Sequence, residues 1–212
     1  SWYDYPAAVD NYIGLFGKIE NGTIQNVTLE NGYVNGDCWE VWEELEMGWM
    51  VVDNGGSSYI GGLVGYNFQG TIIACHTSVN VQGAMQIGGL VGVNDGGQIV
   101  FSSAAGSVMC CIPMDQGGNE LGGLVGHNTG TIISCRASNG PVSGYDSTGG
   151  LVGSNLGVIT SYYAIANVYG EDYSLFSTGG LSVINSGAIT SSYATGRVWG
   201  GHGLVGTGEV SR

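Results

Sequence analysis

Five cysteines and a set of acidic and tryptophan side chains are the residues of this chain whose types could support cross-linking or binding. The cysteines are Cys38, Cys75, Cys110, Cys111 and Cys135, and an odd number leaves at least one thiol free or available for an interchain bond. We expect an edge disulfide among Cys38, Cys110 and Cys111, with interchain bonds from the remainder. Cys75 and Cys135 have a second interpretation, as small buried hydrophobic residues.

Acidic and tryptophan side chains are candidates for contact with a partner subunit, a sugar polymer or Ca²⁺. The residues singled out are Trp39, Trp42, Glu43, Glu44, Glu46, Trp49, Asp115 and Asp172. The alternative is that their loops pack the aromatic rings over the fold and point the acids at water. No oxygen-ligand spacing typical of a calcium loop is present, and the cysteines and histidines lack metal-site spacing. We therefore expect no metal site and no cofactor.

Charge and composition exclude several classes of protein. Among 212 residues there are 17 acids and only 4 Lys or Arg, a formal net charge of −13, which argues against partners such as nucleic acid or an anionic membrane surface. No apolar run reaches the ~18 residues of a membrane helix, so we expect no membrane insertion.

The histidines, His76, His127 and His202, fall at different repeat positions, and no catalytic pair can be assembled from the repeat register. We expect no enzymatic activity.

An internal repeat must position these residues. The phrase Gly-Leu-Val-Gly begins at Gly62, Gly89, Gly123, Gly150 and Gly203, with variants at Gly14 and Gly180. Each of the first six units continues with a glycine, an isoleucine two residues later and a valine some ten residues beyond. The isoleucines are Ile24, Ile72, Ile99, Ile132, Ile159 and Ile189, and the valines are Val34, Val81, Val108, Val142, Val168 and Val198.

The repeat predicts an all-β fold, a parallel β-solenoid of about six to seven coils. One unit cannot bury its apolar side alone, but stacked units place identical residues above one another, ~4.8 Å apart. Asparagines at a shared turn position predict an internal ladder of Asn67, Asn94, Asn128, Asn155 and Asn185. Cys75 and Cys135 share a position with Ser102 between them, so they lie two rungs apart, too far to pair. We expect glycine at the coil corners, where the backbone turns with positive φ.

Insertions fall at one repeat position, so the loops should emerge on one edge of a single domain spanning 1–212. The longest insertion, 37–60, is acidic, amphipathic and rich in tryptophan, and its charges would also discourage edge-to-edge pairing of sheets. Residues 1–12 form an N-terminal segment or cap, and 201–212 a truncated last repeat. The chain shows no convincing C-terminal cap, which suggests a trimmed sequence or head-to-tail addition of subunits.

These units resemble the GLUG motif, most clearly from Gly179-Gly180-Leu181 through Ile189 to Val198-Trp199-Gly200. The resemblance covers roughly 13–36 and 59–206. GLUG repeats occur in microbial surface proteins, including adhesins, so the resemblance implies an extracellular location and a scaffold or adhesive role. It carries no catalytic residues. The sequons at Asn21 and Asn26 are candidate glycosylation sites.

Three functions follow as hypotheses. The first is an extracellular structural protein, a self-assembling solenoid subunit of a cell-surface layer, sheath or fibre, whose partner is itself and whose chains are cross-linked by interchain disulfides. The second is an adhesin or polysaccharide-binding module that uses the acidic, aromatic loop edge to contact surface glycans or other envelope proteins. The third, a β-helix carbohydrate-active enzyme, needs converging carboxylates, and here the acids lie in loops.

Overall fold

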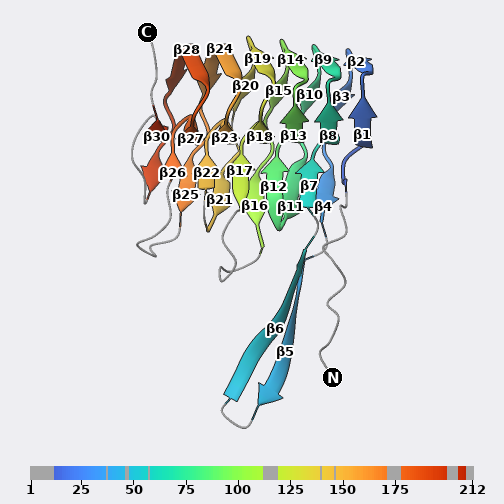
Figure 1. The fold of residues 1–212 in the computed structure, drawn as a ribbon, viewed down its shortest axis with the longest axis vertical. Coiled ribbons are helices and arrows are strands. Elements are labelled where there is room, and N and C mark those ends of the chain that lie inside the picture. Colours follow the sequence, from blue (N-terminus) through green and yellow to red (C-terminus); the bar gives the residue numbers. More distant parts are fainter. Residues whose placement is uncertain are drawn as a thin grey trace.

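The computed structural model describes residues 12–36, 38–45, 48–56, 58–111, 119–138, 140–145, 147–170, 178–199 and 205–208, without the side chains of 38–56, 162 and 205–208. All regular structure in this part of the chain is β-strand, and all strands except those of one hairpin are wound as a parallel solenoid (Figure 1). The predicted all-β parallel β-solenoid is confirmed at this level.

Four parallel sheets run along the solenoid; three of them take one strand segment from successive turns, and the second takes up to two. The first sheet contains β1 (Phe16–Glu20), β8 (Val64–Phe68), β13 (Val91–Asp95), β18 (Val125–Asn128), β23 (Val152–Asn155), β27 (Ser182–Asn185) and β30 (Val205–Gly208). The third contains β4 (Tyr33–Asn35), β11 (Asn80–Gly83), β16 (Val108–Cys110), β21 (Val142–Gly144), β25 (Val168–Gly170) and β29 (Val198–Trp199). The fourth contains β7 (Ser58–Gly61), β12 (Met85–Gly88), β17 (Glu120–Gly122), β22 (Ser147–Gly149) and β26 (Thr178–Gly179).

The second sheet is bent and has two rows of short strands. One row is β2 (Thr23–Gln25), β9 (Thr71–Ile73), β14 (Gln98–Val100) and β19 (Thr131–Ile133). The other row is β3 (Thr28–Leu29), β10 (His76–Thr77), β15 (Ser103–Ala104) and β20 (Arg136–Ala137). Both rows merge into the longer strands β24 (Val158–Ala164) and β28 (Ala188–Ala194).

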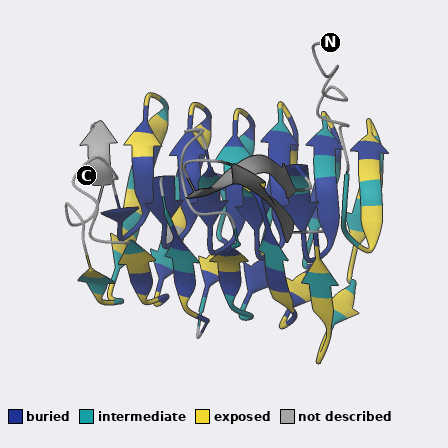
Figure 2. Cartoon of the chain, turned by 90° about the horizontal axis from the view of Figure 1, so that it is seen from below, coloured by how far each residue is buried: buried dark blue, intermediate teal, exposed yellow. Residues whose placement is uncertain are grey.

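Side-chain ladders form the core, as the repeat predicts. The six isoleucines pair in register from strand to strand along the second sheet, and the six valines do so along the third. Figure 2 shows buried residues running through the stack and exposed residues at its corners and outer faces. Because every turn stacks its apolar side chains on the next, the core is a column shared by all turns.

The asparagine ladder is also confirmed. Each Asn donates its Nδ2 to the Oδ1 of the Asn in the next turn, at 2.7–2.8 Å, from Asn67 through to Asn185. The same Nδ2 atoms donate to a turn carbonyl in their own coil, for example that of Gly97 from Asn94. Buried amides in a parallel stack are therefore hydrogen-bonded in a continuous chain.

The expected role of glycine at the corners is wrong. At the bend of the second sheet the left-handed residues are Asn26, Ala74, Phe101, Ser134, Ser161 and Ser191, with φ between 49° and 56°. Gly96 (φ 61°) is the single glycine with positive φ in the described part of the chain. The repeated glycines are needed for close stacking instead, because a Cβ at Gly130 would overlap the carbonyl oxygen of Gly97.

The insertion that begins at residue 37 contains an antiparallel hairpin, β5 (Cys38–Leu45) and β6 (Gly48–Gly56), with a register shift between Val41 and Trp42. Its two strands pair with each other and with no strand of the four sheets. The hairpin extends away from the coils at the lower edge of Figure 1. The solenoid register therefore does not depend on it.

Candidate functional site

Polar and aromatic side chains gather where the fourth sheet meets the first. Tyr59, Gln86 and Glu120 occupy one register position in β7, β12 and β17. Tyr66 and His127 occupy one position in β8 and β18, with Val93 between them in β13. Stacking therefore brings side chains from separate turns to one surface, which we call the tyrosine–carboxylate cluster: Tyr12, Tyr59, Tyr66, Gln86, Asp95, Glu120, His127 and Thr129.

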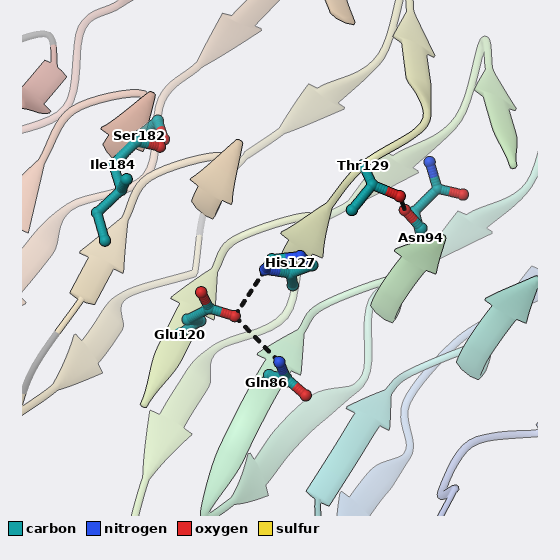
Figure 3. Close-up of polar contacts among 7 residues, drawn as sticks. All are labelled: Gln86, Asn94, Glu120, His127, Thr129, Ser182 and Ile184. Atoms are coloured by element: carbon teal, nitrogen blue, oxygen red, sulfur yellow. Dashed lines mark hydrogen bonds and ion pairs between the residues drawn. The ribbon is translucent and has the colours of Figure 1, made fainter. Parts of the chain in front are cut away.

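Glu120 and His127 form the central contact of this cluster. The Nδ1 atom of His127 lies 2.8 Å from Oε2 of Glu120, and Nε2 of Gln86 donates to the same oxygen at 3.2 Å (Figure 3). The side chains of His127 and Glu120 are only 21% and 17% exposed. The hydrogen bond to Glu120 raises the pKa of His127 above its ordinary value, against the opposing effect of burial, and the charge of Asp95 adds to the increase.

Asp95 binds hydroxyl groups on both of its oxygens. Tyr66 donates its hydroxyl to Oδ2 at 2.7 Å, and Thr129 donates to Oδ1 at 3.0 Å. The pKa of Tyr66 is raised, first by burial and then by this hydrogen bond to the carboxylate. Asp95 is thus held in place by residues from the turns on either side of its own.

Three tyrosine rings cover the neighbouring surface. The ring centroids of Tyr12 and Tyr59 lie 5.3 Å apart in a stacked arrangement, and Tyr66 meets both rings edge-on at 5.3 and 5.6 Å. Aromatic faces beside carboxylates suit a sugar, because the rings contact its C–H face while the carboxylates accept its hydroxyl hydrogens.

The cluster does not form a nucleophilic triad in the described residues, since His127 contacts a carboxylate and no serine hydroxyl or cysteine thiol. Nor do three His, Cys, Asp or Glu side chains gather as metal ligands anywhere in the described ranges. Within the same ranges no helix has the length and apolar character needed to span a membrane.

No pair involving a histidine could be assembled from the repeat register, and the Glu120–His127 contact is therefore a finding of the structure. The register could not reveal this pair, because the position of Glu120 holds a different residue type in each of the neighbouring turns. The one available signal was the seven-residue separation across a Gly-Gly turn, which brings the end of one strand beside the next.

The cysteines divide into two groups. Cys111 is disulfide-bonded. Cys75, Cys110 and Cys135 are buried thiols. The disulfide proposed among Cys38, Cys110 and Cys111 remains a prediction as a set, since the side chain of Cys38 lies outside the described residues.

Burial corrects the interchain role offered to Cys75, Cys110 and Cys135. Their exposed fractions are 0%, 4% and 2%, so their sulfurs cannot reach another chain while the coils are intact. Cys75 and Cys135 instead follow the alternative interpretation as core residues, with Ser102 between them. Ser102 donates its amide to Sγ of Cys135, and its Oγ accepts the amide hydrogen of Cys75. Burial raises the pKa of Cys135 to about 12, which keeps the thiol protonated.

The predicted acidic, aromatic edge lies outside the described side chains. Trp39, Trp42, Glu43, Glu44 and Trp49 belong to the hairpin, of which only the backbone is described. Glu46, Asp115 and Asp172 lie outside the described residues altogether. Asn21 and Asn26, the candidate glycosylation sites, are both exposed.

Comparison with known proteins supports the repeat. The family described as the GLUG motif matches residues 56–82, which span β7 to β11. The chain therefore contains a GLUG repeat. Searches of curated proteins and of solved structures gave no match.

Proposed function

We propose that this chain is an extracellular structural protein without catalytic activity, a β-solenoid subunit that associates with copies of itself through its third sheet. The observation that carries the proposal is the absence of charge there: none of the described strands β4, β11, β16, β21, β25 and β29 contains Asp, Glu, Lys or Arg. The core of a protein–protein interface is depleted in charged side chains and enriched in aromatic residues and Met.

The third sheet also exposes large apolar side chains. Met109, Tyr169 and Trp199 are 45%, 38% and 41% exposed, and all three sit at outward positions of one register row. The rings of Tyr169 and Trp199 are stacked, with centroids 4.4 Å apart. A second copy that covered this row would remove apolar area from water. Arg197, whose guanidinium lies over the ring of Trp199, is a charged group beside the row, although the strands themselves contain none.

The number of coils belongs to the same proposal. We infer six to seven, supported by seven strands in the first sheet and six in the third, each separated from the next by one repeat. The resemblance of the repeats to surface proteins supports an extracellular location, and the exposed sequons at Asn21 and Asn26 are compatible with one.

A matched pair of lysine substitutions tests self-association. Tyr169→Lys places a charge on the third sheet, and Val158→Lys places one at a similarly exposed position of the same turn on the second sheet (38% and 43%). In sedimentation velocity runs over a concentration series, we expect the unmodified chain and Val158→Lys to associate and Tyr169→Lys to stay monomeric. A monomeric unmodified chain at high concentration, or equal effects of both substitutions, would overturn the proposal.

A second candidate function, saccharide binding in an adhesive role, is supported by the tyrosine–carboxylate cluster. Three tyrosine rings lie beside the carboxylates of Asp95 and Glu120 on a surface built by several turns. We expect neutral glycans to change the intrinsic fluorescence of the chain, and Tyr59→Ala to abolish the change. Silence across a broad glycan array would exclude this candidate.

A further inference from the structure

A hollow lies at the bend of the second sheet, on a surface distinct from the tyrosine–carboxylate cluster. Its volume is about 400 Å³, within the range of small-ligand sites. Its lining combines two aromatic residues, Phe101 and Tyr163, with His76, Arg136 and serines from successive turns.

The backbone bends in the same way in each turn that borders this hollow. Phe101, Ser134 and Ser161 have φ of 51°, 51° and 55°, so the chain turns sharply between the two strand rows. Beyond the bend, His76, Ser103, Arg136 and Tyr163 stand in one register row. Four different side chains therefore replace what would otherwise be a ladder of identical residues.

Among the residues that the structure describes, Arg136 has no acidic partner. In the described residues the salt bridges are those of Lys18 with Glu20 and of His127 with Glu120, and Arg136 instead donates to the hydroxyl of Tyr163 at 3.3 Å. The chain has only 4 Lys or Arg against 17 acids. Of the three described Lys or Arg side chains, Lys18 pairs with Glu20, whereas Arg136 and Arg197 lie beside aromatic rings, and only Arg136 lines this hollow.

Aromatic faces and hydroxyls surround that guanidinium. Phe101 is 61% exposed, and the ring of Tyr163 stacks on Tyr193 at 5.7 Å with 15° between the planes. Nδ1 of His76 is engaged with Oγ of Ser103 at 2.8 Å, which leaves Nε2 as the ring nitrogen that can contact a ligand.

We propose that this hollow binds a carboxylate-bearing sugar unit of an acidic polysaccharide, through the local positive charge of Arg136 on a chain whose formal net charge is −13. The planar guanidinium of Arg136 pairs with the sugar carboxylate through two parallel hydrogen bonds. The face of the sugar ring packs on Phe101 and Tyr163, and its hydroxyls reach Ser134, Ser161 and His76. Serine hydroxyls and aromatic faces fit a polyhydroxylated ring better than the backbone of an acidic peptide. This site is independent of the third sheet and of the tyrosine–carboxylate cluster.

Calorimetric titration with a galacturonic acid tetramer tests the proposal, with a neutral galactose tetramer and tetraglutamate as comparison ligands. We expect the uronate to bind, and Arg136→Gln to weaken its affinity by about tenfold or more, as for other hydrogen-bonded charge pairs. Arg136→Lys retains the charge but loses the paired geometry, so it should give an intermediate affinity. Arg197→Gln removes an equal charge at another site, over the ring of Trp199, and should have no effect.

Circular dichroism establishes that each variant is folded before titration. Three results would overturn the assignment: no uronate binding by the unmodified chain, equal losses in Arg136→Gln and Arg197→Gln, or tetraglutamate binding as tightly as the uronate. An equal loss of neutral-tetramer and uronate affinity in Arg136→Gln would also overturn the pairing of Arg136 with the sugar carboxylate. None of these results depends on whether the chain self-associates.

Discussion

Glu120 presents one carboxylate oxygen to both His127 and Gln86, and this contact makes a single residue pair sensitive to pH. The folded pKa of His127 is raised, so the protonated histidine is favoured by folding. Its contribution to stability is fully present below the ordinary histidine pKa of 6.5 and is lost as the pH rises through the higher folded pKa. The surface that carries the cluster is thus most stable in mildly acidic solution.

Proton NMR titration of His127 checks this assignment. We expect Glu120→Gln to lower the folded pKa of His127 markedly, because the direct hydrogen bond to a carboxylate is its largest cause. Asp95→Asn removes a charge that acts on His127 without such a hydrogen bond, so its effect should be smaller. A larger effect from Asp95→Asn would contradict the assignment.

Asn67 supplies a second prediction at the residue scale. Its buried Oδ1 has no hydrogen-bond partner in the described structure, and the residue beside it in the preceding turn is Ile19. In the ladder each Nδ2 donates toward the next turn, so Ile19→Asn would supply the donor that Asn67 lacks. We expect Ile19→Asn to be about 2 kcal/mol more stable than Ile19→Asp, which has no donor when ionised. Urea unfolding of the two variants measures the difference, and equal midpoints would refute it.

The asparagine ladder and the Glu120–His127 pair differ in whether the sequence could predict them. The ladder was predictable because each Asn follows its leucine by four residues in five units. The Glu120–His127 pair was not, because the register position of Glu120 holds a different residue type, Tyr59, Gln86 or Ser147, in the other turns and so shows no repeat in the sequence. A site built from departures in a repeat cannot be found from the repeat itself.

At the scale of strands and turns, the repeated glycines allow neighbouring turns to stack closely, because they have no Cβ. The repeat suggested that glycine supplies positive φ, but serine, alanine, asparagine and phenylalanine occupy the left-handed corners at the bend of the second sheet. The sequence could not distinguish the two roles, because both place glycine once per turn near a change of direction. The contacts of a hypothetical Cβ do distinguish them.

Two alanine substitutions separate these roles. Gly130→Ala forces a methyl group against the carbonyl oxygen of Gly97, so the turns must move apart, at a cost of about 3 kcal/mol or more. A Cβ at Gly96 would make only an ordinary contact with the side chain of Gln69, at 3.5 Å, but the residue keeps a positive φ of 61°, so we expect Gly96→Ala to cost about 1 kcal/mol. Chemical unfolding gives both values. A larger loss of stability in Gly96→Ala than in Gly130→Ala would instead indicate that the glycines are needed for positive φ.

For the whole molecule, stability resides in the stacked sheets, and the hairpin β5–β6 lies outside them. The position of this insertion was predictable from the interrupted repeat, whereas its antiparallel pairing was not, since no second copy of the segment reveals a period. The hairpin sequence contains five acids, Glu40, Glu43, Glu44 and Asp53 within the strands and Glu46 between them, and no Lys or Arg. It therefore contributes a large share of the net negative charge.

Replacement of residues 38–56 by a short glycine-serine linker should leave the thermal midpoint of the coils within a few degrees of the original, measured under reducing conditions. The same variant should associate more strongly in sedimentation runs, because five negative charges are lost from each subunit. Increased salt should reduce the difference in self-association between the variant and the unmodified chain, because it screens the negative charges of the hairpin. A collapse of the thermal transition would show that the hairpin supports the coils after all.

The asparagine ladder tolerates chain segments of unequal length between its rungs. Consecutive asparagines are separated by 27, 34, 27 and 30 residues, yet the hydrogen bond between each pair of side-chain amides has an Nδ2–Oδ1 distance of 2.7–2.8 Å. Loop length is thereby uncoupled from axial rise. A foreign peptide grafted between Cys111 and Asn119 should be carried at a fixed height on an unchanged column, which makes the molecule a candidate carrier for arrays of displayed epitopes at regular intervals.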